Sequence, residues 1–201
     1  MFCPNDMIDK YNNNALLQSY QRELSFKDFL LNKVGGDFIH VMPTKIIQKL
    51  PFDEKLRIYE GVFFLRFYKN VNNILFTKEI VTIRERSRKD SVTREVFRTN
   101  KISIQKNITA TNLLINWFDT DYLKYNAKGI LAVNYLNLIE NYILLSDYVN
   151  AKANIRKVKS LGYNISLKIK FLYRFRIGFL YRLLLKYYLL IKYSVLNKRL
   201  K

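Results

Sequence analysis

The sequence predicts a mixed α/β fold in which an N-terminal half with a few strands is followed by a mostly α-helical C-terminal half. Residues 74–76 and 79–84 are rich in β-branched and aromatic residues, which favours strands. From about residue 90 onward, apolar residues recur with helical spacing instead. A length of 201 residues allows one domain with its own core and an appendage.

The individual helices are predicted from apolar spacing and from the residues that end them. Residues 43–49 are expected to form one or two helical turns that close at Pro51, and residues 37–42 have strand-like content. Gly162 is a plausible residue to end a helix. The longer helices are expected over residues 56–68, from 91 through 100 to about 118, and over 121–145, 148–161 and 166–193.

The net charge of +19 is concentrated near the C-terminus. Residues 1–147 carry 21 Lys and Arg and all 16 Asp and Glu, which leaves +5, whereas residues 148–201 carry 14 Lys and Arg and no acid. Such asymmetry indicates an anionic surface as the partner of the tail. Residues 166–201 are therefore predicted to be a basic amphipathic helix that associates with a membrane.

The predicted tail helix places several cations within one arc beside a broad apolar face. The alternative is a helix docked on the core with a basic outer side. The cations in this arc are Arg174, Arg182, Lys186 and Lys192.

Membrane-spanning segments and metal sites are not expected. No uncharged run approaches the ~20 residues that cross a bilayer, and residues 1–15 do not have the pattern of a signal peptide. The chain has one cysteine, Cys3, and one histidine, His40. An intrachain disulfide and a Cys/His zinc site are therefore both excluded.

Two segments carry the most specific pattern. The first is Pro51-Phe-Asp-Glu54 followed by Glu60, which opens an aromatic helix, and the second is the basic loop with Ser91-Val-Thr93. In order and spacing they resemble the C-terminal half of family-2 glycosyltransferases of the GT-A fold. The resemblance implies that residues 1–120 are the acceptor-side part of a GT-A domain. A helical hairpin over residues 121–165 and the tail helix would follow it.

The resemblance implies an inverting sugar transfer in which a base takes the proton of the acceptor hydroxyl. The family has Glu-Asp where this chain has Glu60-Gly61, so either Glu60 has taken over the role of the base or the base is absent. The alternative is that Glu60, in the first turn of its helix, only favours the helix dipole.

The other candidate residues are assigned to substrate binding by the same resemblance. It places the basic loop close to the nucleotide diphosphate of the donor, where positive charge stabilises the leaving group; the alternative is a solvated charged loop. It places His40 in a wall of the acceptor site; the alternative is a structural or exposed histidine. The loop residues concerned are Arg84, Arg86, Arg88 and Ser91.

The nucleotide-binding half of the family, with its Asp-x-Asp metal motif, has no counterpart in this sequence. A complete family member would need Mg²⁺ or Mn²⁺, but this chain is expected to bind no metal or cofactor. We therefore expect the chain to be inactive by itself, as a truncated product or, less favoured, as half of a split enzyme.

The expected function is transfer of a sugar from a nucleotide-sugar to a growing surface polysaccharide or a lipid-linked acceptor. The expected location is cytoplasmic and peripheral, on the inner face of the cell membrane. The alternative is a non-catalytic basic protein that binds nucleic acid or an anionic membrane surface. Nucleic acid is disfavoured as a partner, because the charge lies on a strongly apolar helix rather than along a polar groove.

Overall fold

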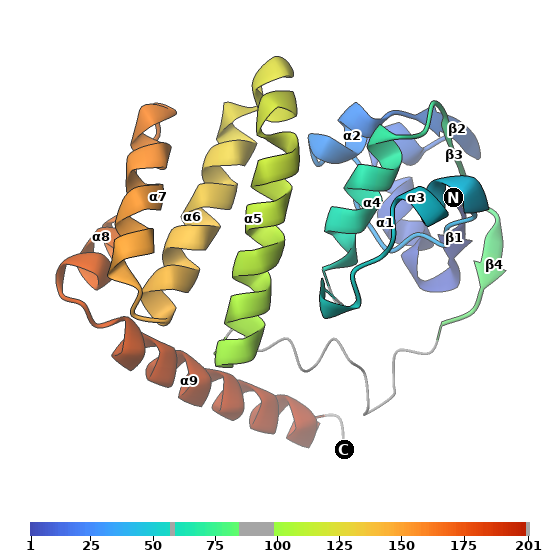
Figure 1. Cartoon of the computed structure of the whole chain (residues 1–201). Helices are drawn as coiled ribbons and strands as arrows, with labels where there is room; N and C mark the ends of the chain where they lie inside the picture. Colours follow the sequence, from blue (N-terminus) through green and yellow to red (C-terminus); the bar gives the residue numbers. More distant parts are fainter. Residues whose placement is uncertain (57–58, 85–98, 200–201) are drawn as a thin grey trace. The chain divides into compact units, whose positions relative to one another are not determined.

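A computed structural model describes residues 1–56, 59–84 and 99–199, without the side chains of residues 55, 190 and 192–199. The chain divides into two compact units, Met1–Ser91 and Val92–Lys201 (Figure 1). The N-terminal unit contains small sheets and short helices, and the C-terminal unit is helical. The predicted change from a mixed half to a helical half is thus confirmed. The two units meet at residues 91 and 92, close to residue 90, from which the sequence predicts helical structure.

The N-terminal unit is built from short elements. Turns and short helices alternate with strands of two to four residues. In chain order the elements are β1 (Cys3–Pro4), the 3₁₀ turn η1 (Asn5–Met7), α1 (Ile8–Asn12), η2 (Ala15–Leu17), β2 (Gln21–Leu24), α2 (Phe26–Leu30), α3 (Thr44–Lys49), η3 (Glu54–Leu56), α4 (Glu60–Lys69), β3 (Ile74–Thr77) and β4 (Ile80–Thr82).

One extended segment, residues 74–82, joins the two sheets of this unit. Its first part, β3, pairs antiparallel with β2, and its second part, β4, pairs parallel with β1. The strands predicted over 74–76 and 79–84 are therefore present, although their partners come from the first 24 residues. The strand expected over residues 37–42 is reduced to a single bridge between Phe2 and Ile39.

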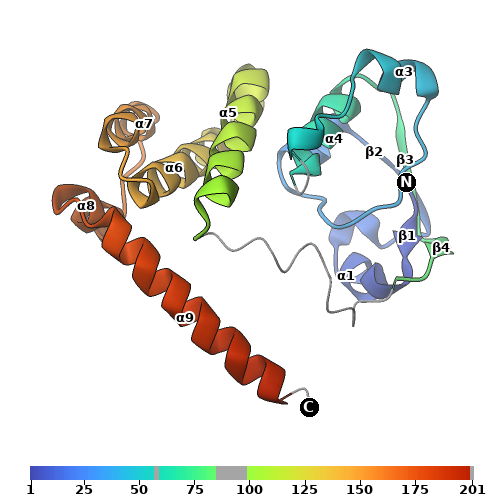
Figure 2. The same ribbon diagram turned by 60° about the horizontal axis from the view of Figure 1, so that its bottom comes forward.

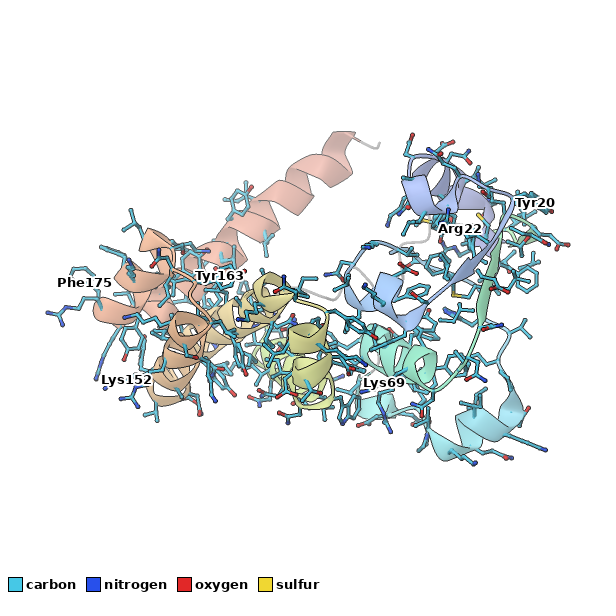
Figure 3. All side chains as sticks on the ribbon, turned by 90° about the horizontal axis from the view of Figure 1, so that it is seen from above. Tyr20, Arg22, Lys69, Lys152, Tyr163 and Phe175 are labelled. Atoms are coloured by element: carbon cyan, nitrogen blue, oxygen red, sulfur yellow. The ribbon has the colours of Figure 1, made fainter. Side chains whose placement is uncertain are left out.

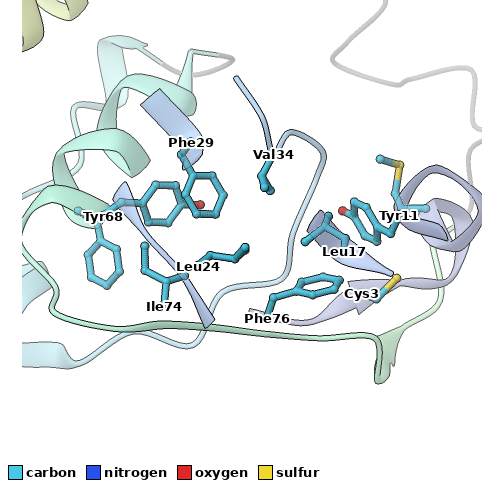
Figure 4. Close-up of a cluster of buried hydrophobic side chains, with 11 residues drawn as sticks. Cys3, Tyr11, Leu17, Leu24, Phe29, Val34, Tyr68, Ile74 and Phe76 are labelled. Atoms are coloured by element: carbon cyan, nitrogen blue, oxygen red, sulfur yellow. The ribbon is translucent and has the colours of Figure 1, made fainter. Parts of the chain in front are cut away.

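Aromatic side chains hold the N-terminal unit together, because two-stranded sheets are marginal on their own. Tyr11 stacks on Phe38, with ring centroids 5.0 Å apart, and meets Phe76 edge-on at 5.5 Å. Phe29 packs against Tyr68 at 4.1 Å. Figure 4 shows Tyr11, Phe29, Tyr68 and Phe76 together with aliphatic side chains from β2 and β3 in one buried cluster.

The C-terminal unit is a series of helices joined by short turns. Four junctions each contain one residue in the left-handed conformation, namely Asn126 (φ 54°), Ser146 (φ 63°), Gly162 (φ 87°) and Arg176 (φ 53°). The helices are α5 (Lys101–Lys124), α6 (Lys128–Leu144), α7 (Tyr148–Ser160), α8 (Leu167–Arg174) and α9 (Gly178–Arg199).

Two of these junctions correct the helices expected from the sequence. The expected helix over 121–145 is broken at Asn126, and the expected helix over 166–193 is broken at Arg176. At the first break the Ala127 amide donates to the Tyr122 carbonyl over 2.7 Å, the bond that closes a Schellman motif. Helical apolar spacing continues across both breaks, so the pattern alone does not show them. The helix end predicted at Gly162 is confirmed.

Hydrogen bonds join α5 to α6, whereas apolar contacts join α6 to α7 and α8. Between α5 and α6, the side-chain amides of Asn137 and Asn141 both donate to the side-chain oxygen Oδ1 of Asn107 over 2.9 Å. An apolar cluster that includes Ile143 and Val158 joins α6, α7 and α8. Helix α9 starts beside α6 and α8 and then extends away from the other helices of its unit (Figures 1 and 2).

The start of α9 is held by a very close approach of backbones. The Gly178 amide donates to the Tyr148 hydroxyl over 3.1 Å, and a Cβ atom at residue 178 would lie 1.8 Å from the Ile143 carbonyl oxygen. No side chain fits at this position unless α9 moves off α6.

We therefore expect Gly178→Ala to lower the free energy of unfolding by about 1–3 kcal/mol, as overpacking does. Chemical denaturation followed by circular dichroism measures it. Gly35→Ala is the control, because no atom lies within 4 Å of the added Cβ there. Equal stability of the two variants would contradict the close packing of α9 on α6.

Candidate functional site

The predicted catalytic residue Glu60 begins α4. Phe64 and Tyr68 follow it by one and two turns, so all three residues lie on one face of the helix. His40 stacks on Phe64, with ring centroids 4.0 Å apart at 13°, and its Nε2 atom is 2.7 Å from the Tyr68 hydroxyl. The structure thus places His40 on the helix face that Glu60 opens.

Tyr68 was not anticipated from the sequence as a site residue. Its position eight residues after Glu60, at helical spacing, was the signal that could have found it. Burial raises the pKa of the Tyr68 phenol, so this hydroxyl keeps its proton. The Tyr68 hydroxyl and the His40 Nε2 atom form a hydrogen bond, and the same hydroxyl lies 3.5 Å from the Met1 sulfur.

His40 is neutral in this environment. Burial lowers the pKa of its imidazole to about 4, with a smaller effect from the nearby N-terminal amine, while the hydrogen bond at Phe38 opposes the shift. A group with so low a pKa is a poor proton acceptor at neutral pH. His40 therefore suits the wall of a site better than the role of a general base.

A groove of about 460 Å³ lies beside this pair, towards the C-terminal end of α4. His40 and Tyr68 form part of its lining together with the side chains of Asn70, Asn72 and Asn73. Amides and an imidazole beside aromatic and aliphatic walls suit an uncharged polar ligand. Glu60 is not among the lining residues, so the groove and the catalytic candidate occupy different ends of the helix.

The turn formed by the motif Pro51-Phe-Asp-Glu54 packs onto α4. Phe52 meets Phe63 edge-on at 5.4 Å, and the Leu56 amide donates to the Asp53 carbonyl over 2.9 Å. The helix expected from residue 56 instead begins at Glu60, after the short turn η3, which contains Glu54.

Arg84 is bound within the N-terminal unit. Its guanidinium contacts Asp6 at 2.8 Å and Asp37 at 3.3 Å, and its amide donates to the Asn5 side chain over 2.8 Å. Two carboxylates therefore already neutralise this cation, and it holds the loop that leads to His40. The other predicted loop residues, Arg86, Arg88 and Ser91, lie outside the described residues.

The predicted tail cations are not on one helix face. Arg174 belongs to α8, whereas Arg182 is only 8% exposed in α9, with its guanidinium 5.3 Å from the centre of the Phe179 ring. Lys186 is exposed, and the side chain of Lys192 lies outside those described. The break at Arg176 thus removes Arg174 from the basic arc expected over 166–193.

Neither a bilayer span nor a metal site is found in the described part of the chain. None of its helices combines the length and apolar character needed to cross a bilayer. Nowhere in residues 1–56, 59–84 and 99–199 do three His, Cys, Asp or Glu residues converge in a way that could hold a metal ion. Comparison of the chain with protein-family models, curated proteins and solved structures yields no match in any of the three.

The chain's only histidine makes the environment of His40 directly measurable. We expect its imidazole Hε1 signal in NMR spectra to titrate with a pKa near 4. The unfolded chain takes up this proton near pH 6.5 and the folded chain does not, so stability is complete above pH 6.5 and falls as the pH drops towards 4.

The free energy of unfolding falls by up to about 3 kcal/mol over this pH range, relative to a chain that lacks the His40 imidazole. Denaturation of the wild type and of His40→Gln at a series of pH values isolates it from the titration of carboxylates. An imidazole that titrates between pH 6 and 7 would show that His40 is solvated and not packed on α4.

Proposed function

We propose that this chain supplies the acceptor side of an inverting glycosyltransferase of the GT-A type. Such an enzyme transfers a sugar from a nucleotide-sugar to a saccharide or lipid-linked acceptor. The observation that carries the proposal is the motif Pro51-Phe-Asp-Glu54 followed by Glu60, with Phe52 packed onto the helix that Glu60 opens. His40 on the same helix face supports it, as does the small mixed unit that holds both residues.

In this proposal the acceptor hydroxyl attacks the anomeric carbon of the donor sugar. A new carbon–oxygen bond forms while the bond to the diphosphate breaks, and the nucleoside diphosphate leaves with the bonding electrons. The proton of the hydroxyl passes to a carboxylate, and Glu60 is the candidate in this chain. Glu60 lies in the first turn of α4, at the positive end of the helix dipole.

The groove beside His40 and Tyr68 is the proposed place for part of the acceptor. Sugar hydroxyls both donate and accept hydrogen bonds, and side-chain amides such as those of Asn70, Asn72 and Asn73 can do both in return. The neutral His40–Tyr68 pair adds polar atoms without a charge that would need a counter-ion. Tyr68 acts through His40 and is a positioning residue.

The donor and its metal ion require residues beyond those described. Mg²⁺ or Mn²⁺ would neutralise the diphosphate in a complete enzyme, but the described residues do not fit such an ion. Arg84 is already paired with Asp6 and Asp37, so donor contacts in the basic loop are assigned to Arg86, Arg88 and Ser91.

Glu60→Gln tests the proposal in the complete enzyme, that is, this chain together with a donor-binding half. We expect kcat for transfer to fall by about 10²-fold or more, because the amide cannot take the proton. Glu54→Gln is the matched control, since Glu54 is an exposed carboxylate in the turn just before the helix. Unchanged turnover in Glu60→Gln would leave Glu60 with only a helix-stabilising role.

A further inference from the structure

The surface of α8 and α9 has features that sugar transfer does not require. It consists of the exposed side chains between Leu167 and Ile191, and we call it the α8–α9 surface. No acid occurs anywhere in residues 148–201. Lys168 pairs with Glu140 of α6, but Lys170, Arg174 and Lys186 are exposed and have no ion-pair partner among the described side chains.

The exposed side of α9 is apolar. At about 100° per residue, its exposed large side chains between residues 179 and 191 fall within an arc of about 180° that contains no charged residue. Lys186 lies at the edge of this arc, and Arg182 lies beyond it, folded over Phe179. The members of the arc with most of their area exposed are Phe179, Leu180, Leu184, Tyr187, Tyr188 and Ile191.

Helix α8 repeats the combination of apolar and basic stripes. Leu167, Phe171 and Phe175 are exposed at four-residue spacing, and the rings of the last two lie 4.6 Å apart. Lys170 and Arg174 form the neighbouring stripe, again four residues apart. Figure 3 shows Phe175 at the outer edge of the unit.

We propose that the α8–α9 surface binds the surface of an anionic lipid bilayer, with α9 lying in the plane of the interface. The apolar side chains of α9 would enter the boundary between headgroups and acyl chains, and the exposed cations Lys170, Arg174 and Lys186 would meet lipid phosphates and carboxylates. The proposal does not depend on the proposed sugar transfer.

Charge complementarity selects this partner over the others. A second copy of the chain would bring together two acid-free cationic surfaces. Nucleic acid would neutralise the cations but leave Leu180, Leu184 and Ile191 in water. An anionic bilayer satisfies both the cations and the apolar face, and α9 lies on it because none of the described helices can cross it.

Sedimentation of the full chain with lipid vesicles tests the proposal. The probes are vesicles of phosphatidylcholine with 30% phosphatidylserine and vesicles of phosphatidylcholine alone. We expect binding to the anionic vesicles. Lys170→Gln, Arg174→Gln and Lys186→Gln together should lower the partition coefficient by about 10- to 100-fold, since each cation near an anionic surface contributes several-fold.

The matched charge control is the triple Lys152→Gln, Lys157→Gln and Lys159→Gln on α7. These side chains are also exposed, and their replacement changes the net charge equally. We expect it to lower binding much less. An equal loss in both triples would show attraction by net charge alone and would overturn the assignment to the α8–α9 surface.

Apolar insertion has its own pair of variants. The triple variant Leu180→Ser, Leu184→Ser and Ile191→Ser should lower vesicle binding at least tenfold. The control triple is Ile102→Ser, Val133→Ser and Val149→Ser, which changes exposed apolar side chains on α5, α6 and α7. We expect this control to bind vesicles as the wild type does. Circular dichroism checks that both triples fold. Binding to DNA without binding to anionic vesicles, or vesicle binding unaffected by the α9 triple, would contradict the proposal.

Discussion

The N-terminal unit depends on the contact between His40 and α4. Its strands are two to four residues long and form only two-stranded sheets among the residues described, so strand pairing alone cannot hold a helix in place. The imidazole stacked on Phe64 and bonded to Tyr68 links the loop after residue 35 to the helix that begins at Glu60. Arg84 binds the same loop at Asp37. The candidate catalytic residue and the groove therefore share one support.

The contact of His40 with Phe64 and Tyr68 also explains how a polar site can be packed against the aromatic cluster. His40 is neutral, and Tyr68 keeps its proton, so neither brings a buried charge into the aromatic cluster. The ion pairs of Arg84 with Asp6 and Asp37 lie at the other end of the loop after residue 35. The N-terminal amine of Met1 lies beside the groove, and the uncharged His40–Tyr68 pair forms the part of the lining that suits an uncharged acceptor.

Much of the secondary structure could be predicted from the sequence, but the pairing of its elements could not. The extended segment over residues 74–82 was evident from its β-branched residues. Its partner strands were not evident, because β1 and β2 lie at least 50 residues earlier and their register depends on tertiary packing. Asn126 and Arg176 break helices inside continuous apolar patterns, and only the cap hydrogen bonds and the close approach at Gly178 reveal this.

The candidate site shows the same division. Glu60 and His40 could be named from motifs, but their common helix face became evident only through Phe64 and Tyr68. Arg84 pairs with Asp6, 78 residues away, and no local pattern in the sequence indicates this pair. In the C-terminal unit the excess of cations was plain from composition. Composition did not show that Arg182 folds over Phe179 or that the outer side of α9 is apolar.

We propose that this chain binds the acceptor near His40 and the donor through the basic loop. The most direct test compares two variants of the complete enzyme, Tyr68→Phe and the pair Arg86→Ala with Arg88→Ala, by measuring KM for each substrate. The account predicts that Tyr68→Phe raises KM for the acceptor several-fold and leaves KM for the nucleotide-sugar unchanged. The arginine pair should do the reverse. If both variants raise KM for the same substrate, or if neither changes any KM, the assignment of the two sides is contradicted.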